Sequence, residues 1–241
     1  MASPELKILI ISSIVGILPP LLWLCLFWLR EDNAHPEPKR IVALVFVLGM
    51  LAIFPAERLS RFAMGFFTQG TFLLIAAQAF VEELMKFLAA YLGAMWHNRD
   101  FDEPIDAMIY LITAAIGFSA FENVLFMYYS VDGGGMLTGL HSNALRFIGA
   151  TMLHTLSSAT LGAFIGFAFY RSTFIKNKSL IIGLILATLL HSMYNGLILM
   201  QGNSETSGYL TIFGMMWVGI IVLLFFFEKI KDIFRPNKLI T

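Results

Sequence analysis

Two adjacent glutamates, Glu82 and Glu83, lie within a stretch of the sequence that is otherwise apolar enough to cross a lipid bilayer. Lys86 follows them by one helical turn, and apolar residues flank the group on both sides. A carboxylate at the centre of a membrane helix costs about 2.5–3.5 kcal/mol on insertion scales. Because that cost is high, an acidic pair in this position indicates chemistry carried out inside the membrane.

The composition supports a membrane protein with several spans. The chain has 241 residues, of which 58% are hydrophobic and 13% charged, and its mean hydropathy is +0.78. Soluble domains carry about 25% charged residues, so this chain has about half the usual charge. Its net charge is zero, which argues against nucleic acid as a partner and leaves the lipid bilayer as the main environment.

Length and hydrophobicity predict an all-α bundle of seven transmembrane helices, or eight if one long segment is divided. The hydrophobic segments run over about 7–29, 41–56, 71–96, 104–129, 144–170, 179–200 and 209–227. Residues 57–67 form a short amphipathic stretch that we expect to lie in the membrane interface. The connections are too short to fold independently, so we expect a single membrane domain over residues 1–241.

The positive charges predict the orientation of these helices. With seven crossings, eleven Lys and Arg residues fall on one side of the membrane and four on the other, leaving aside the intramembrane Lys86. Cytoplasmic loops carry the excess of positive charge. We therefore expect the N-terminus outside and the C-terminus in the cytoplasm.

Polar side chains of a catalytic type occur in three later hydrophobic segments, at Glu122, His154 and His191. At about 1.5 Å of rise per residue, these three and Glu82 all lie about 11–17 Å below the outer ends of their helices. Four separate helices thus place an unusual polar residue in one layer of the membrane. One shared site is the economical explanation.

The local spacings are consistent with such a site. Lys86 lies four residues after Glu82 and three after Glu83, so its ammonium can neutralise either carboxylate while the other acts. His191 and Asn195 are also four apart and share a helix face. Structural readings stay open beside this one: a buried ion-pair cluster, and histidines that bond across helices.

The ordered motifs resemble the PrsW family of bacterial intramembrane proteases, which make the first cut in membrane-anchored anti-sigma factors. The motifs are Glu82-Glu83-x-x-Lys86, Gly117-Phe118-x-x-x-Glu122-Asn123, Arg146 with His154, His191-x-x-x-Asn195, and the early Glu31-Asp32 with His35-Pro36-Glu37-Pro38. This family is related to the CAAX prenyl endopeptidase and bacteriocin-processing superfamily. There the second motif ends in histidine, so Glu122 favours the PrsW branch.

The resemblance implies hydrolysis of a peptide bond in a membrane-anchored protein of the bacterial cell membrane, by one of two mechanisms. In the first, zinc is held by His154, His191 and a carboxylate, either Glu122 or Glu83, and Glu82 is the general base. In the second, Glu82 activates water without a metal, and His191 and Asn195 stabilise the oxyanion. Lys86 orients or neutralises Glu83 in both.

Two other classes of function compete with a protease. A transporter uses buried carboxylates and histidines as a proton or cation relay, although the sequence shows no internal repeat of the kind many transporters have. A non-catalytic membrane scaffold leaves the shared polar layer unexplained.

Overall fold

The computed structural model describes residues 4–28, 36–134, 136–201 and 206–233, and within these ranges it contains helices and no strand. The helices are α1 (Pro4–Trp28), α2 (Lys39–Leu51), α3 (Ile53–Ala63), α4 (Phe72–Ala90), α5 (Asp106–Gly134), α6 (Met136–Phe167), α7 (Thr173–Gln201) and α8 (Thr206–Lys231). α4 continues into one π-helical turn, Tyr91–Met95. The predicted all-α architecture is confirmed.

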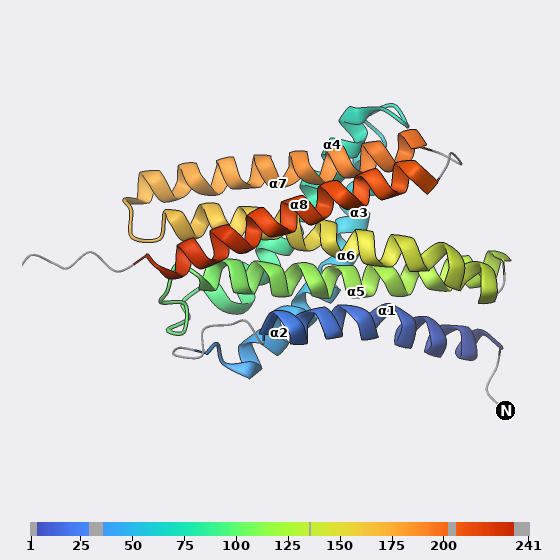
Figure 1. Cartoon of the computed structure of the whole chain (residues 1–241), viewed down its shortest axis with the longest axis horizontal. Coiled ribbons are helices and arrows are strands. Elements are labelled where there is room, and N and C mark those ends of the chain that lie inside the picture. The colour runs from blue at the N-terminus through green and yellow to red at the C-terminus, as the bar shows by residue number, and fades with distance from the viewer. Residues whose placement is uncertain (1–3, 29–35, 135, 202–205, 234–241) are drawn as a thin grey trace, which may run out of the picture.

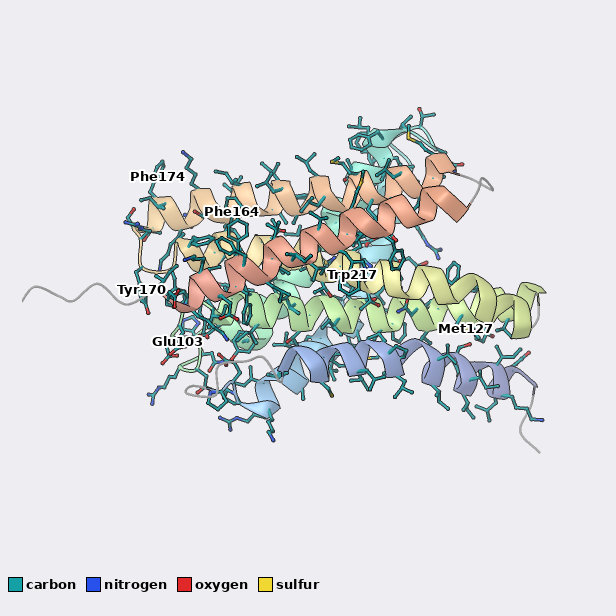
Figure 2. All side chains as sticks on the ribbon, viewed as in Figure 1. Glu103, Met127, Phe164, Tyr170, Phe174 and Trp217 are labelled. Carbon is teal, nitrogen blue, oxygen red and sulfur yellow. The ribbon has the colours of Figure 1, made fainter. Side chains whose placement is uncertain are left out.

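Five helical segments of the described chain are long and apolar enough to cross a membrane. They cover Glu5–Leu22, Lys39–Ala63, Asp106–Val131, Thr173–Met200 and Phe213–Lys231. The outer surface is correspondingly apolar: in Figure 2 the labelled Phe174, at the start of α7, points away from the bundle, and Trp217 lies on the outer side of α8. The chain is therefore a multi-pass membrane protein.

The second predicted segment ends later than the sequence suggested. Helical structure continues past residue 56. A single residue, Ala52, separates α2 from α3, and its backbone stays helical (φ −62°, ψ −18°). Pro55 is tolerated since it lies in the first turn of α3, where backbone N–H groups lack helical partners anyway. Residues 57–63 of the expected interfacial stretch belong to α3, and the segment over 39–63 is long and apolar enough to cross a membrane. The position of the stretch in the membrane interface stays a prediction.

α5 is the central helix of the bundle. It packs against α6, α1 and α2, and Figure 1 shows α1, α5, α6, α7 and α8 running along the long axis while α2 and α3 cross behind them. Two glycines permit the close approach of α2 and α5: a Cβ at Gly117 would lie 2.1 Å from the carbonyl oxygen of Phe46, and one at Gly49 would lie 2.2 Å from that of Ala114.

A polar contact fixes the beginning of α5 to the segment before α2. The Tyr110 hydroxyl donates to the carboxylate of Glu37, and the side chain of Asp106 is hydrogen-bonded to the same group. Asp106 Oδ2 also accepts from the backbone N–H of Asp102 at 2.9 Å and of Glu103 at 2.7 Å. Burial raises the pKa of Glu37, and the contact joins the segment before α2 to the beginning of α5.

We expect Gly117→Ala to destabilise the protein, because its methyl group would push α5 away from the backbone of α2. The measurement is the thermal unfolding temperature in detergent. The matched control is Gly214→Ala on α8, where nothing lies within 4 Å of the added Cβ and alanine is the better helix former by about 1 kcal/mol. Equal unfolding temperatures for the two variants would contradict the close approach.

Candidate active site

The charged residues of α4 divide between two faces of that helix. Ala79, Glu83, Lys86 and Ala90 are buried, and their spacing of three or four residues places them on one stripe that faces the bundle. Glu82 precedes Glu83 by one residue, which places it about 100° around the helix axis from this stripe. Its side chain is 22% exposed. The two adjacent glutamates therefore occupy different environments.

Glu83 is fully buried and accepts hydrogen bonds from three helices. Its Oε1 receives Lys86 Nζ at 2.5 Å, Ser157 Oγ at 2.7 Å and His191 Nδ1 at 2.7 Å, and its Oε2 receives Ser158 Oγ at 2.9 Å. A carboxylate has about four acceptor positions. Glu83 therefore accepts four hydrogen bonds, three at Oε1 and one at Oε2.

Lys86 links this carboxylate to His154 and Glu122. Its Nζ lies 3.0 Å from His154 Nδ1, and His154 Nε2 lies 3.0 Å from Glu122 Oε2. An ammonium only donates, so Nδ1 accepts and the ring hydrogen sits on Nε2, which donates to Glu122. The ring of Phe118 packs against Lys86 and His154: its centroid lies 5.4 Å from Lys86 Nζ and 5.4 Å from the centroid of the His154 ring.

His191 has the opposite arrangement of its ring nitrogens. Because Glu83 only accepts, the hydrogen bond at Nδ1 places a ring hydrogen there, and in the neutral imidazole this leaves Nε2 with a lone pair. That Nε2 lies 3.6 Å from Glu82 Oε2. The rings of His191 and His154 meet edge to face, with centroids 5.1 Å apart. Glu82, His191 and His154 therefore surround one small volume.

Six of the seven residues singled out from the sequence lie together in this cluster: Glu82, Glu83, Lys86, Glu122, His154 and His191. Asn195 lies one turn beyond His191 on α7 and is half-buried, and no hydrogen bond joins it to the described members of the cluster. The side chain of Arg146 and the residues Glu31, Asp32 and His35 lie outside the described part of the chain.

Two residues that bond to Glu83, Ser157 and Ser158, were not identified from the sequence. Serines are common in membrane helices and many bond to their own helix, as Ser13 does to the carbonyl of Leu9. The one available signal was position: both lie one turn after His154 on α6. They supply two of the four hydrogen bonds that hold Glu83.

The donor atoms of Glu82, His154 and His191 lie within 4.8 Å of one another and form a possible metal site. Two imidazoles and one carboxylate are a usual donor set for a catalytic zinc. His191 fits this role well, because metal-bound histidines usually donate their other ring hydrogen to a carboxylate, here Glu83. His154 fits when Lys86 is an uncharged amine, since only then can the hydrogen move to Nδ1 and free Nε2. The carboxylate ligand in this possible metal site is Glu82, whereas the sequence suggested Glu122 or Glu83.

Fold and site together define a multi-pass helical membrane protein with a carboxylate–histidine centre enclosed in its bundle. The family model for PrsW family intramembrane metalloproteases matches residues 37–227. The chain belongs to this family and is an intramembrane protease. Membership decides between the classes that the sequence left open, in favour of the protease and against the transporter and the scaffold.

Relatives named Protease PrsW are similar to this chain over most of its length. The protein of Halalkalibacterium halodurans is 28% identical over 190 residues, which cover 77% of this chain and 82% of the relative. That of Oceanobacillus iheyensis is 25% identical over 206 residues, covering 84% and 89%, and that of Bacillus subtilis is 25% identical over 182 residues, covering 75% and 79%. No solved structure matches the chain.

We expect Lys86→Met to destabilise the protein by about 3–5 kcal/mol, because it leaves the buried Glu83 carboxylate without its cation. Adding Glu83→Gln in the same chain removes the unpaired charge and should restore most of the loss. Thermal unfolding of both variants measures this. Arg61→Met, which breaks an exposed pair with Glu57, is the control and should have little effect. A Lys86→Met variant as stable as the wild type would show that Glu83 carries no charge when folded.

Proposed function

We propose that this protein hydrolyses a peptide bond of a membrane-anchored protein with Glu82 as the group that acts on the attacking water. The observation that carries the proposal is the contrast between the two glutamates. Glu83 is fully buried and accepts four hydrogen bonds, whereas Glu82 is partly exposed and its Oε2 lies 3.6 Å from Nε2 of His191. A partly exposed carboxylate is the one that a water molecule and a substrate can reach.

The other residues of the cluster hold this arrangement or stabilise charge. Glu83 fixes the ring of His191, and Lys86 neutralises Glu83 and donates to His154. His154 in turn donates to Glu122, whose side chain is 26% exposed, so Glu122 is partly accessible, as Glu82 is. Asn195 follows His191 by one turn, and we propose that its amide donates to the oxyanion of the scissile carbonyl.

Zinc is the metal that we propose for the site, and Glu82, His154 and His191 would hold it. In this version Glu82 would act on the water as a ligand of the metal and not as a free general base. The usual role of such a metal, when bound, is to activate water and polarise the carbonyl group. The donor set supports this choice, as does the family's description as metalloproteases. Glu122, which the sequence placed among the ligands, would then lose its hydrogen bond from His154, because Nε2 of that ring would bind the metal instead.

The contact between Lys86 and His154 favours a second, metal-free version. With Lys86 as an ammonium, Nε2 of His154 carries a hydrogen and is a donor, not a ligand. Glu82 then takes the proton from water directly, and we propose His154 and Asn195 as the donors to the developing negative charge. His191 Nε2 is left to exchange a proton with Glu82.

The proposal also covers the substrate and the orientation of the protein in the membrane. A single-pass protein such as an anti-sigma factor is the proposed substrate, in the bacterial cell membrane, with the N-terminus outside and the C-terminus in the cytoplasm as the positive charges predict. Residues 1–241 act as one membrane-embedded protease domain. Under this topology the cluster lies in the outer half of the bilayer, and cleavage takes place there.

We expect Glu82→Gln to leave the protein folded and to lower cleavage by about 10²–10⁴-fold, the usual effect of removing a general base. Purified protein is reconstituted in liposomes with a single-pass candidate substrate, and cleavage is followed with time. Glu228→Gln, which changes an exposed carboxylate on α8, is the matched control and should cleave at the wild-type rate. Wild-type turnover in Glu82→Gln would contradict the proposed role.

Metal analysis of active protein distinguishes the two versions. With zinc at the site, one equivalent copurifies with the protein, chelation stops cleavage reversibly, and His191→Ala lowers bound metal and activity together. In the metal-free version His191→Ala loses activity while metal stays near zero throughout. His97→Asn is the control, since His97 lies outside the bundle with a left-handed backbone (φ 55°) that asparagine tolerates. Full activity without metal excludes zinc.

A further inference from the structure

Ser157 and Ser158 direct their hydroxyls away from their own helix. A serine or threonine in a membrane helix commonly donates to the carbonyl four residues earlier, and on α6 Thr155 and Thr160 do so, to Thr151 and Leu156 at 2.8 Å each. Ser158 instead crosses to Glu83 Oε2 on α4. Ser157 crosses to Glu83 Oε1 at 2.7 Å, with a longer contact of 3.2 Å to its own helix at His154.

The two hydroxyls hold opposite oxygens of one carboxylate. The last torsion of a glutamate side chain has a broad energy profile, so a carboxylate held at one oxygen can rotate. Lys86 and His191 both bond to Oε1, and among the described residues Ser158 is the donor to Oε2. The serine pair therefore sets the plane of the Glu83 carboxylate.

That plane determines where His191 points. His191 Nδ1 donates to Glu83 Oε1 at 2.7 Å, and this bond aims Nε2 at Glu82, 3.6 Å away. A rotated carboxylate would move Oε1 away from Nδ1 and turn the ring. The effect of the serines on the reaction would thus pass through Glu83 to His191, with no contact to the substrate.

We propose that Ser157 and Ser158 are positioning residues of the protease, which act through Glu83 to fix the ring of His191. This inference rests on the proposed function, since it assigns the serines a part in the same reaction. It predicts a loss in kcat and an unchanged KM for variants that lack the hydroxyls, because neither serine touches the substrate.

The test measures kcat and KM for Ser157→Ala, Ser158→Ala and the double variant in liposomes with a single-pass substrate. We expect the double variant to lose about 10–100-fold in kcat, as for other residues that orient a catalytic histidine, with KM within about twofold. Ser192→Ala is the matched control, because Ser192 is buried next to His191 but donates to the Thr188 carbonyl of its own helix. It should keep the wild-type kcat.

A double-mutant cycle separates an effect through Glu83 from a general loss of packing. In the Glu83→Gln background, loss of the two hydroxyls should lower kcat by less than about threefold more. An equal loss in both backgrounds, a rise in KM with unchanged kcat, or wild-type kcat in the double serine variant would overturn the proposal. The proposed function fails separately, if the wild type does not cleave or Glu82→Gln cleaves normally.

A spectroscopic readout covers the case in which the double variant does not fold. The chain has five histidines, so nitrogen-15 labelling of histidine gives few resonances, and His191→Ala assigns the one that matters. In the wild type and in Ser192→Ala, the Nδ1 hydrogen of His191 should show the signature of a short hydrogen bond to a carboxylate. In the single variant Ser158→Ala this signature should weaken. An unchanged signal there would overturn the proposal.

Discussion

A carboxylate shielded from water must find its hydrogen bonds within the protein, and the arrangement of Glu83 follows from that requirement. Its four donors come from α4, α6 and α7, so the three helices are fixed to one another at the depth of the site. Each donor is then oriented by the same group. The buried charge, which is costly in itself, makes the geometry of the neighbouring Glu82 and His191 well defined.

The tandem glutamates show how two identical side chains acquire different tasks. An α-helix turns by about 100° per residue, so one glutamate of an adjacent pair faces the bundle while the other faces its margin. Glu83 accepts from Lys86 and two serines, and Glu82 keeps a partly exposed carboxylate next to His191. The two side chains are chemically identical, so their different environments account for the proposed difference in role: Glu83 orients its neighbours and Glu82 reacts.

Much of the fold and part of the site could be predicted from the sequence. Hydrophobic length placed most of the helices, and the cost of polar groups in lipid singled out Glu82, Glu83, Lys86, Glu122, His154 and His191. Spacing alone could not assign Lys86 to Glu83, because three- and four-residue offsets both permit contact. Ser157 and Ser158 could not be recognised either, since their partner is 74 and 75 residues away in the chain. The join between α2 and α3 depended on one backbone conformation at Ala52.

The pairing of Glu83 with Lys86 within one helix also matters while the protein is being made. Helices enter the membrane in the order of synthesis, so α4 is inserted before α6 and α7 exist. A glutamate and a lysine one turn apart neutralise each other inside the lipid and lower the cost of that early insertion. His154 and His191 arrive only with the later helices. The Glu83 carboxylate is therefore already paired when α4 inserts, and the cluster is complete only when α7 packs against the earlier helices.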